Sequence, residues 1–134
     1  MTDECTKRPE ILIVDDILAN RLVLSNIAKI IGCNYTTARN GEEAINLVRN
    51  NRHFDLILMD LEMPVMNGLE TAATIRAMNP DCPTPTIALT AHNADEIAEE
   101  LTANGFSGII EKPFKTDNIR QVVDKYCRNR QNNA

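Results

Sequence analysis

Five short apolar runs recur along the chain, and each is followed by a longer segment in which apolar residues have helical spacing. Runs of this length are too short for helices and are rich in branched side chains, which is typical of strands buried on both faces. Because the runs alternate with helical segments, the pattern predicts a parallel sheet with helices on both faces. We expect strands at residues 11–14, 35–38, 56–59, 86–89 and 108–110.

The rules of chain connection limit how five such strands can be ordered. Crossovers between parallel strands are right-handed, and the common doubly wound order for five strands is 2-1-3-4-5. We therefore predict an α/β fold of the (βα)5 type. The chain has 134 residues, the usual size of one domain. We expect an N-terminal extension at residues 1–8, one domain at 9–128 and a polar tail at 129–134.

Charge and composition exclude several classes of protein. The formal net charge is −5 and no basic cluster is present, so we expect no direct contact with nucleic acid. No segment has the apolar length of a signal peptide or a membrane helix, so we expect a cytoplasmic protein without membrane contact. The four cysteines form no C-x-x-C pair, which argues against a zinc site or a redox motif.

Polar and charged side chains follow four of the predicted strands. Asp15 and Asp16 follow the first strand, Asp60 the third, Thr90 the fourth and Lys112 the fifth. In open α/β sheets, ligands bind at the carboxyl ends of the strands, near the switch in strand order. We expect these five side chains to converge on one site.

Each of these residues has a structural explanation when taken alone. Aspartates after strands commonly cap helices or form turns, a threonine hydroxyl can satisfy a loop amide, and lysines are usually solvated. As a set, however, three carboxylates at one sheet edge repel one another unless a cation compensates them. Mg²⁺ or Mn²⁺ suits such oxygen ligands. The set predicts phosphoryl transfer, with Asp60 as the nucleophile and with Lys112 and Thr90 binding the transferred group.

Four motifs, in this order, resemble the receiver domains of bacterial response regulators and hybrid histidine kinases. The resemblance covers about residues 9–127 and is closer to receivers of hybrid kinases and phosphorelays than to those of transcription factors. Any one motif is weak, but all four in order are highly specific. The motifs are Val14-Asp15-Asp16, Met59-Asp60-Leu61-Glu62-Met63-Pro64-Val65-Met66-Asn67-Gly68, Leu89-Thr90-Ala91 and Lys112-Pro113-Phe114.

The resemblance implies a role for each acidic residue. Asp60 would accept a phosphoryl group from the phosphohistidine of a histidine kinase or a histidine phosphotransfer domain. Asp15, Asp16, Asp60 and the backbone carbonyl of Glu62 would bind Mg²⁺. By the family pattern, Asp16 and Asp60 would be direct carboxylate ligands, and Asp15 would often act through water.

The resemblance also implies how the phosphoryl group is held. Thr90, Ala91 and Lys112 would bind it, and the small Ala91 would leave room for it. The bond between Lys112 and Pro113 would be cis, which would aim the lysine inward.

We expect a monomer or a weak dimer.

Three positions bear on how fast such a domain would lose its phosphoryl group and on how phosphorylation would change its surface. Glu62 and His92 occupy positions at which the family varies its dephosphorylation rate, although we interpret His92 as a plain loop residue. Ile109 stands where the family usually has Tyr or Phe, three residues before the lysine. The phosphorylation chemistry should survive this change, but the usual readout of phosphorylation is in question.

The resemblance favours a signalling phosphoacceptor, a single-domain response regulator that catalyses only its own phosphorylation and dephosphorylation. Alternatives are an excised receiver of a hybrid sensor histidine kinase and a degenerate receiver used only for binding. A flavodoxin-type electron carrier shares this flavodoxin-like fold, but it would need a Ser/Thr/Gly-rich phosphate loop and aromatic residues. A phosphatase with an aspartyl nucleophile places a second acid two residues further on, where Glu62 stands here.

Overall fold

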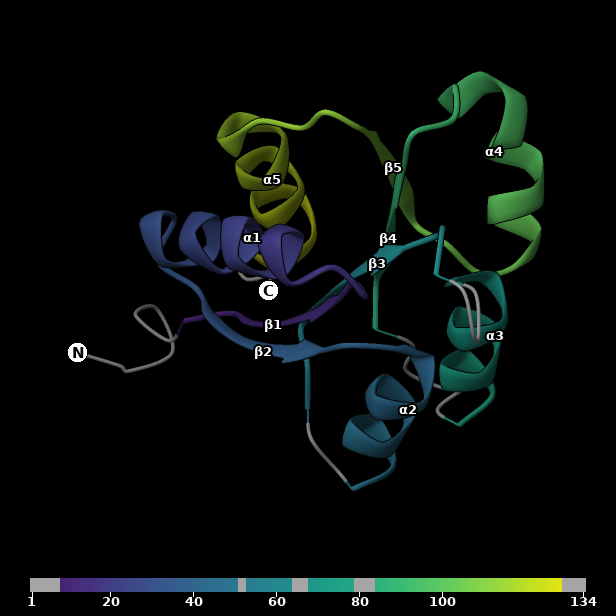
Figure 1. The fold of residues 1–134 in the computed structure, drawn as a ribbon, viewed down its shortest axis with the longest axis horizontal. Coiled ribbons are helices and arrows are strands. Elements are labelled where there is room, and N and C mark those ends of the chain that lie inside the picture. The colour runs from purple at the N-terminus through teal and green to yellow at the C-terminus, as the bar shows by residue number, and fades with distance from the viewer. Residues whose placement is uncertain (1–7, 51–52, 64–67, 79–83, 129–134) are drawn as a thin grey trace.

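Five parallel strands form one sheet in the order β2-β1-β3-β4-β5 (Figure 1). The computed structural model describes residues 8–50, 53–63, 68–78 and 84–128. Both the α/β class and the strand order predicted from the sequence are confirmed. The strands are β1 (Glu10–Val14), β2 (Asn34–Ala38), β3 (Leu56–Asp60), β4 (Thr86–Thr90) and β5 (Gly108–Glu111).

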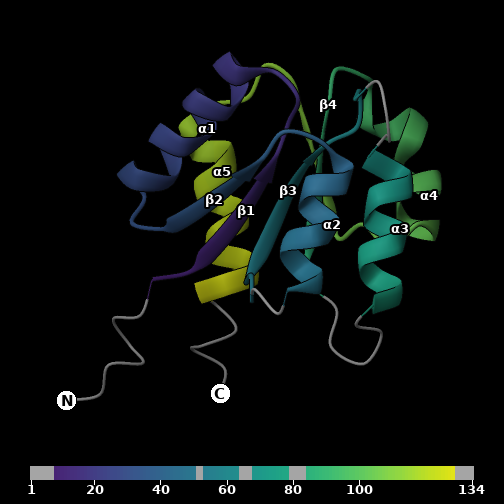
Figure 2. The ribbon, with the colours of Figure 1, turned by 60° about the horizontal axis from the view of Figure 1, so that its bottom comes forward.

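Helices cover both faces of the sheet, as the alternating pattern predicts. In Figures 1 and 2, α1 and α5 lie on one face and α2, α3 and α4 lie on the other. No helix within the described ranges combines the length and apolar character that crossing a bilayer requires. The helices are α1 (Leu18–Ile30), α2 (Gly41–Arg49), α3 (Gly68–Met78), α4 (Ala94–Ala103) and α5 (Thr116–Val123), which continues as the π-helical segment η2 (Asp124–Arg128).

Alternate residues of each central strand enter different halves of the core. Ile11 and Ile13 of β1 pack with the residues of α1 and α5. Leu12 and Val14 of the same strand pack with those of α2, α3 and α4. All five residues of β3 are buried, because this strand has neighbours on both sides and helices on both faces. The continuous apolar run is the sequence signal of this position.

The ends of two helices follow the signals in the sequence. Asn40 precedes α2, and its side chain accepts a hydrogen bond from the Glu43 amide at 2.8 Å, as a capping residue does. After α4 the chain turns at Gly105, whose φ of +89° is in the region that favours glycine. These signals explain where α2 begins and where α4 ends.

One expectation about α3 is wrong. The apolar residues of the segment after Gly68 predict a helix in which Leu69, Ala72 and Ala73 face inward, but Ala73 is exposed. The buried stripe of α3 consists of Gly68, Thr71, Ala72 and Ile75, at spacings of three and four residues, so position 73 lies off that face. Part of the predicted loop before this helix (residues 64–67), most of the expected N-terminal extension (1–7) and the polar tail (129–134) lie outside the described residues.

Candidate functional site

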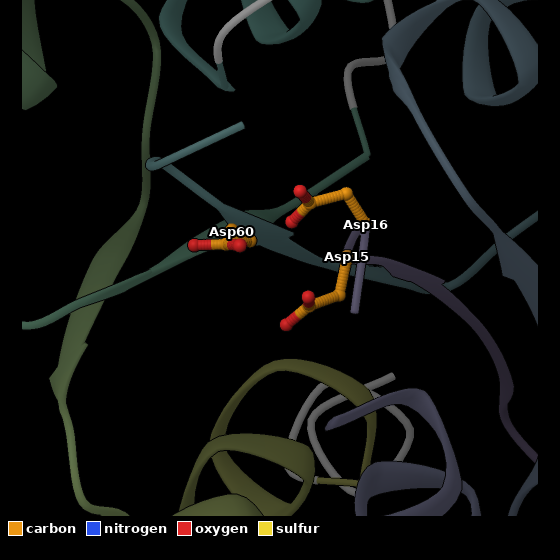
Figure 3. A group of neighbouring side chains, drawn as sticks. All are labelled: Asp15, Asp16 and Asp60. Atoms are coloured by element: carbon orange, nitrogen blue, oxygen red, sulfur yellow. The ribbon is translucent and has the colours of Figure 1, made fainter. Parts of the chain in front are cut away.

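Three aspartate carboxylates meet at the carboxyl ends of β1 and β3. Val14 pairs with Met59 in the parallel register, so the residues that follow them in the chain lie side by side. One carboxylate oxygen from each of Asp15, Asp16 and Asp60 lies within 4.8 Å of the other two. Figure 3 shows Asp15 and Asp16 extending their carboxylates toward the side on which Asp60 lies.

Two of the three aspartates are buried and the third is partly buried, which makes the negative charge of the cluster costly. Asp15 and Asp60 are each only 1% exposed. Burial raises the pKa of Asp15 above its ordinary value, the hydrogen bond from the Ile17 amide opposes this, and the charge of Asp60 adds to it. Carboxylates in this setting favour a bound cation or a proton.

Asp16 supplies a further sign of a cation site. Within the described residues, its buried Oδ1 atom has no hydrogen-bond partner. A buried carboxylate oxygen without a donor is unfavourable, and such atoms in native proteins commonly face an ion or water. Because the cluster offers only hard oxygen ligands, the chemistry of Asp15, Asp16 and Asp60 fits a divalent cation such as Mg²⁺ or Mn²⁺.

Lys112 brings a positive charge to the same cluster from the end of β5. Its ammonium group donates a hydrogen bond to Asp60 Oδ1 at 3.1 Å, and its backbone amide donates to the Thr90 carbonyl at 2.7 Å. The bond between Lys112 and Pro113 is cis, as the sequence resemblance implied. Burial alone would lower the pKa of Lys112, but the hydrogen bond and charge of Asp60, together with the charges of Asp15 and Glu62, outweigh burial and raise it. The lysine therefore remains charged at neutral pH.

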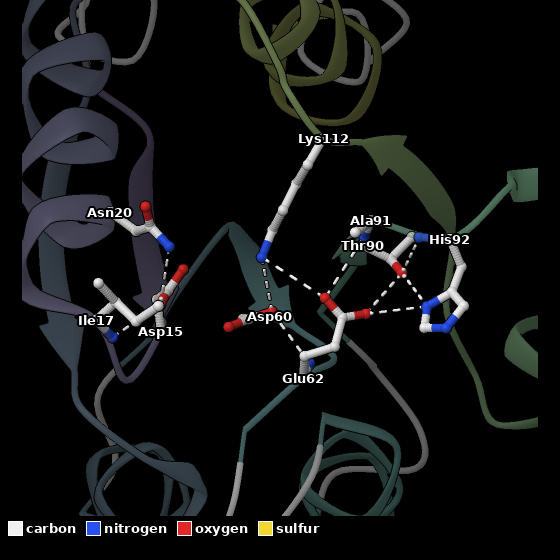
Figure 4. A network of polar contacts seen from close by, with 9 residues as sticks. All are labelled: Asp15, Ile17, Asn20, Asp60, Glu62, Thr90, Ala91, His92 and Lys112. Carbon is white, nitrogen blue, oxygen red and sulfur yellow. Dashed lines mark hydrogen bonds and ion pairs between the residues drawn. The ribbon is translucent and has the colours of Figure 1, made fainter.

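A second set of polar contacts surrounds the Glu62 carboxylate (Figure 4). The buried Thr90 hydroxyl donates to Glu62 Oε2 at 2.8 Å, and the Ala91 amide donates to Oε1 at 3.5 Å. Lys112 Nζ lies 3.8 Å from Oε1. Burial alone would raise the pKa of Glu62, but these contacts outweigh burial and lower it. Glu62 is therefore an ionised acceptor at the centre of the network.

His92 also belongs to this network, although we interpreted it from the sequence as a plain loop residue. Its Nδ1 atom lies 3.2 Å from Glu62 Oε2 and 3.2 Å from the Thr90 hydroxyl. Its backbone amide donates to Thr90 Oγ1 at 3.0 Å. The loop after β4 therefore holds the Thr90 side chain from two directions.

Asn20 and Arg21, for which the sequence pattern indicates no role in the site, also contact Asp15. Asn20 Nδ2 lies 3.5 Å from Asp15 Oδ1, and Arg21 Nη1 donates to the Asp15 carbonyl at 2.8 Å. Both stand on the first turn of α1, five and six residues after Asp15. Because α1 begins just after the acidic end of β1, polar residues in its first turn could have been predicted to reach the site.

The arrangement suits the transfer of an anionic group to Asp60. A carboxylate nucleophile lies beside a charged lysine, while a buried hydroxyl and a backbone amide supply further donors close by. Donors that are already in place stabilise charge as it develops on transferred oxygens. These groups lie beside an acidic trio that fits a divalent cation, and the combination is chemically compatible with phosphoryl transfer.

Known proteins with similar sequences and structures include histidine kinases and a chemotaxis protein. The family model described as the response regulator receiver domain matches residues 11–124. Histidine kinase 5 of Arabidopsis thaliana is 32% identical over an alignment that covers 90% of this chain and 16% of that protein. The chain therefore spans about a sixth of the length of this curated relative.

Two solved structures agree in fold. The chemotaxis protein CheY4 of Vibrio cholerae matches with a TM-score of 0.82 and 29% identity, over 90% of this chain and 99% of that one. The receiver domain of the sensor histidine kinase PA1611 of Pseudomonas aeruginosa matches with a TM-score of 0.79 and 28% identity, over 90% and 98%. That receiver was crystallised with a magnesium ion coordinated in its active site cleft.

Proposed function

Because the chain belongs to the response regulator receiver domain family, we propose that its Asp60 carboxylate accepts a phosphoryl group from a phosphohistidine. The donor is a histidine kinase or a histidine phosphotransfer domain. The observation that carries the proposal is the convergence on buried Asp60 of a lysine ammonium at 3.1 Å and of two further aspartates. The domain is then a signalling phosphoacceptor that acts catalytically only on itself.

The transfer is a displacement at phosphorus. An oxygen of Asp60 forms a bond to phosphorus as the phosphorus–nitrogen bond to the donor histidine breaks, and the electron pair of that bond stays with the imidazole nitrogen. The product is an acyl phosphate on Asp60, and hydrolysis by water returns the carboxylate and inorganic phosphate. Lys112 stays protonated throughout and holds an oxygen of the transferred group.

Asp15, Asp16, Asp60 and the backbone carbonyl of Glu62 would hold Mg²⁺ or Mn²⁺. When bound, the ion supplies positive charge that offsets the charge on the phosphoryl oxygens. Support comes from the oxygen-only cluster, from the buried Asp16 oxygen without a donor among the described residues, and from the magnesium ion in the PA1611 receiver. The Thr90 hydroxyl and the Ala91 amide, which donate to the Glu62 carboxylate in this structure, would donate to the remaining phosphoryl oxygens.

A second arrangement is that this domain is the receiver part of a hybrid sensor histidine kinase. Its likeness to Histidine kinase 5, of which it spans 16%, supports this arrangement. We propose that the domain acts in the cytoplasm as a monomer or weak dimer, without direct contact with nucleic acid.

Intact-mass measurement tests the acceptor assignment. Incubation with acetyl phosphate and Mg²⁺ should add one phosphoryl group to the wild type, and a phosphorylated histidine phosphotransfer domain should act as a donor as well. Asp60→Asn should gain none. Asp55→Asn is the matched control, because Asp55 precedes the same strand at its opposite end, where it accepts from the Glu10 amide. A phosphoryl adduct of equal yield on Asp60→Asn would end the proposal.

A further inference from the structure

The Glu62 carboxylate occupies the point at which the donors for an incoming phosphoryl group converge. From the geometry, and on the basis of the function proposed above, we infer that Glu62 is a built-in substitute for the phosphoryl group. It accepts hydrogen bonds from the Thr90 hydroxyl and the Ala91 amide and lies 3.8 Å from the Lys112 ammonium. The phosphoryl group enters the site only when this side chain leaves it.

The three donors come from different parts of the fold, so their meeting on one carboxylate is specific. Thr90 is the last residue of β4 and Ala91 follows it, whereas Lys112 follows β5. In Figure 4 the Glu62 carboxylate lies between Lys112 on one side and the loop after β4 on the other. A carboxylate and a phosphoryl group are both anions that accept through several oxygens, so they compete for the same donors.

Glu62 is built so that its side chain can leave while its backbone stays. Its amide donates to Asp60 Oδ1 at 3.1 Å, which anchors the main chain beside the acceptor. Its side chain is 38% exposed, so rotation into solvent transfers the charge to water rather than to the protein interior. Replacing the Glu62 carboxylate by a phosphoryl group therefore costs little free energy beyond the loss of the contacts that Glu62 makes.

The net effect of Glu62 should be inhibitory. Its contact with Thr90 does help to hold the hydroxyl in place before the phosphoryl group arrives. The His92 amide, however, also donates to Thr90 Oγ1, and the Thr90 side chain is fully buried. The loop therefore keeps Thr90 in position without Glu62. Removing the Glu62 carboxylate then mainly removes a group that competes with the phosphoryl group for these donors and a negative charge that repels it.

Equilibrium titration with beryllofluoride in the presence of Mg²⁺ tests this role. Glu62→Ala should bind the phosphoryl analogue about tenfold more tightly than the wild type, the change expected when one charge-assisted competitor is lost. Glu62→Asp keeps the charge but is one methylene shorter, so it should also bind more tightly. Glu99→Ala, which removes an exposed carboxylate from α4, should match the wild type.

A structural readout accompanies the titration. In metal-free protein, Glu62→Ala should shift the amide resonance of Ala91, because that amide loses its acceptor. After beryllofluoride binding, the Ala91 resonances of wild type and variant should converge, since the analogue then fills the same place in both. Convergence supports the substitute role, and persistent difference contradicts it.

Two negative outcomes are distinguishable. If the wild type binds beryllofluoride and Glu62→Ala binds it no more tightly, or if Glu62→Asp behaves as the wild type does, the substitute role fails while the acceptor role of Asp60 stands. If neither the wild type nor the variants bind beryllofluoride, the acceptor role itself fails and the inference falls with it.

Discussion

Lys112 Nζ lies 3.1 Å from Asp60 Oδ1, although 52 residues separate the two in the chain. The sheet order produces this contact, because β4 lies between β3, which ends at Asp60, and β5, which ends one residue before Lys112. The Lys112 amide is fixed in turn to the carbonyl of Thr90, the last residue of β4. The ammonium group therefore reaches the acceptor from a backbone that neighbouring strands hold in register.

Lys112→Ala should retain Mg²⁺ binding, or bind the ion more tightly, because a positive charge next to the aspartates is removed. Phosphorylation of Asp60 by acetyl phosphate should slow by about a hundredfold, the usual effect of losing one preorganised donor to developing charge. Lys29→Ala, in the last turn of α1, is the control. Mg²⁺ titration and the rate of adduct formation measure the two effects. Unchanged phosphorylation kinetics in Lys112→Ala would contradict the role assigned to it.

Mg²⁺ affinity should depend more on Asp16 than on Asp15. Asp15 Oδ1 already accepts from the Ile17 amide at 2.9 Å, whereas Asp16 Oδ1 has no partner within the described part of the chain. Asp16→Ala should therefore lower the affinity for Mg²⁺ by at least about tenfold, and Asp15→Ala should lower it by less. Calorimetric titration of both variants measures the difference. Equal affinity in wild type and Asp16→Ala would refute the assignment.

Asp15→Asn should stabilise the metal-free protein at neutral pH. Burial raises the pKa of Asp15 in the folded state, so the folded chain holds this proton at a pH where the unfolded chain has lost it. The ionised group therefore destabilises the fold at neutral pH, and this cost shrinks as the pH falls below the raised pKa and is gone at the ordinary pKa of an aspartate. Removing the charge should add about 1 kcal/mol to the free energy of unfolding.

Urea denaturation in a chelator, at neutral and at acidic pH, measures this effect. The advantage of Asp15→Asn over the wild type should shrink as the pH falls, and it should reverse at neutral pH when Mg²⁺ is added, because Mg²⁺ stabilises the wild type more. An advantage of the variant that grows on acidification would show that the charge of Asp15 is not the cause.

More of the fold than of the hydrogen-bond network at the site could be predicted from the sequence. The sheet order follows from apolar runs such as the one before Asp60, and the site aspartates follow from their place after strands. The partner of the Glu62 carboxylate could not be predicted in this way, although Thr90 itself is expected at the site. Which of several donors a flexible glutamate side chain meets depends on loop geometry rather than on spacing or periodicity. The same limit applies to His92.

The last prediction concerns Ile109, which lies half-buried on β5 and packs against the core on the α2, α3 and α4 side. By the family pattern that the sequence resembles, an aromatic ring at this position would swing inward as the threonine moves toward the phosphoryl group. Ile109 has no ring to rotate, and its branched side chain is stiff at χ1. The Thr90 hydroxyl already faces the Glu62 carboxylate, so phosphorylation leaves less movement to transmit. A switch shifts only by the difference in contacts between its two states.

Beryllofluoride should therefore perturb the loops of Asp60, Thr90 and Lys112 clearly, while the face formed by α4, β5 and α5 changes little. NMR shift mapping of wild type measures both regions in one experiment. Ile109→Tyr restores a ring at this position and should enlarge the shifts across that face. Wild-type shifts there as large as those at the site would contradict the prediction. Coupling would then run by another route, for which the 2.7 Å hydrogen bond from the Ala94 amide to the Glu111 carboxylate offers a direct link between α4 and β5.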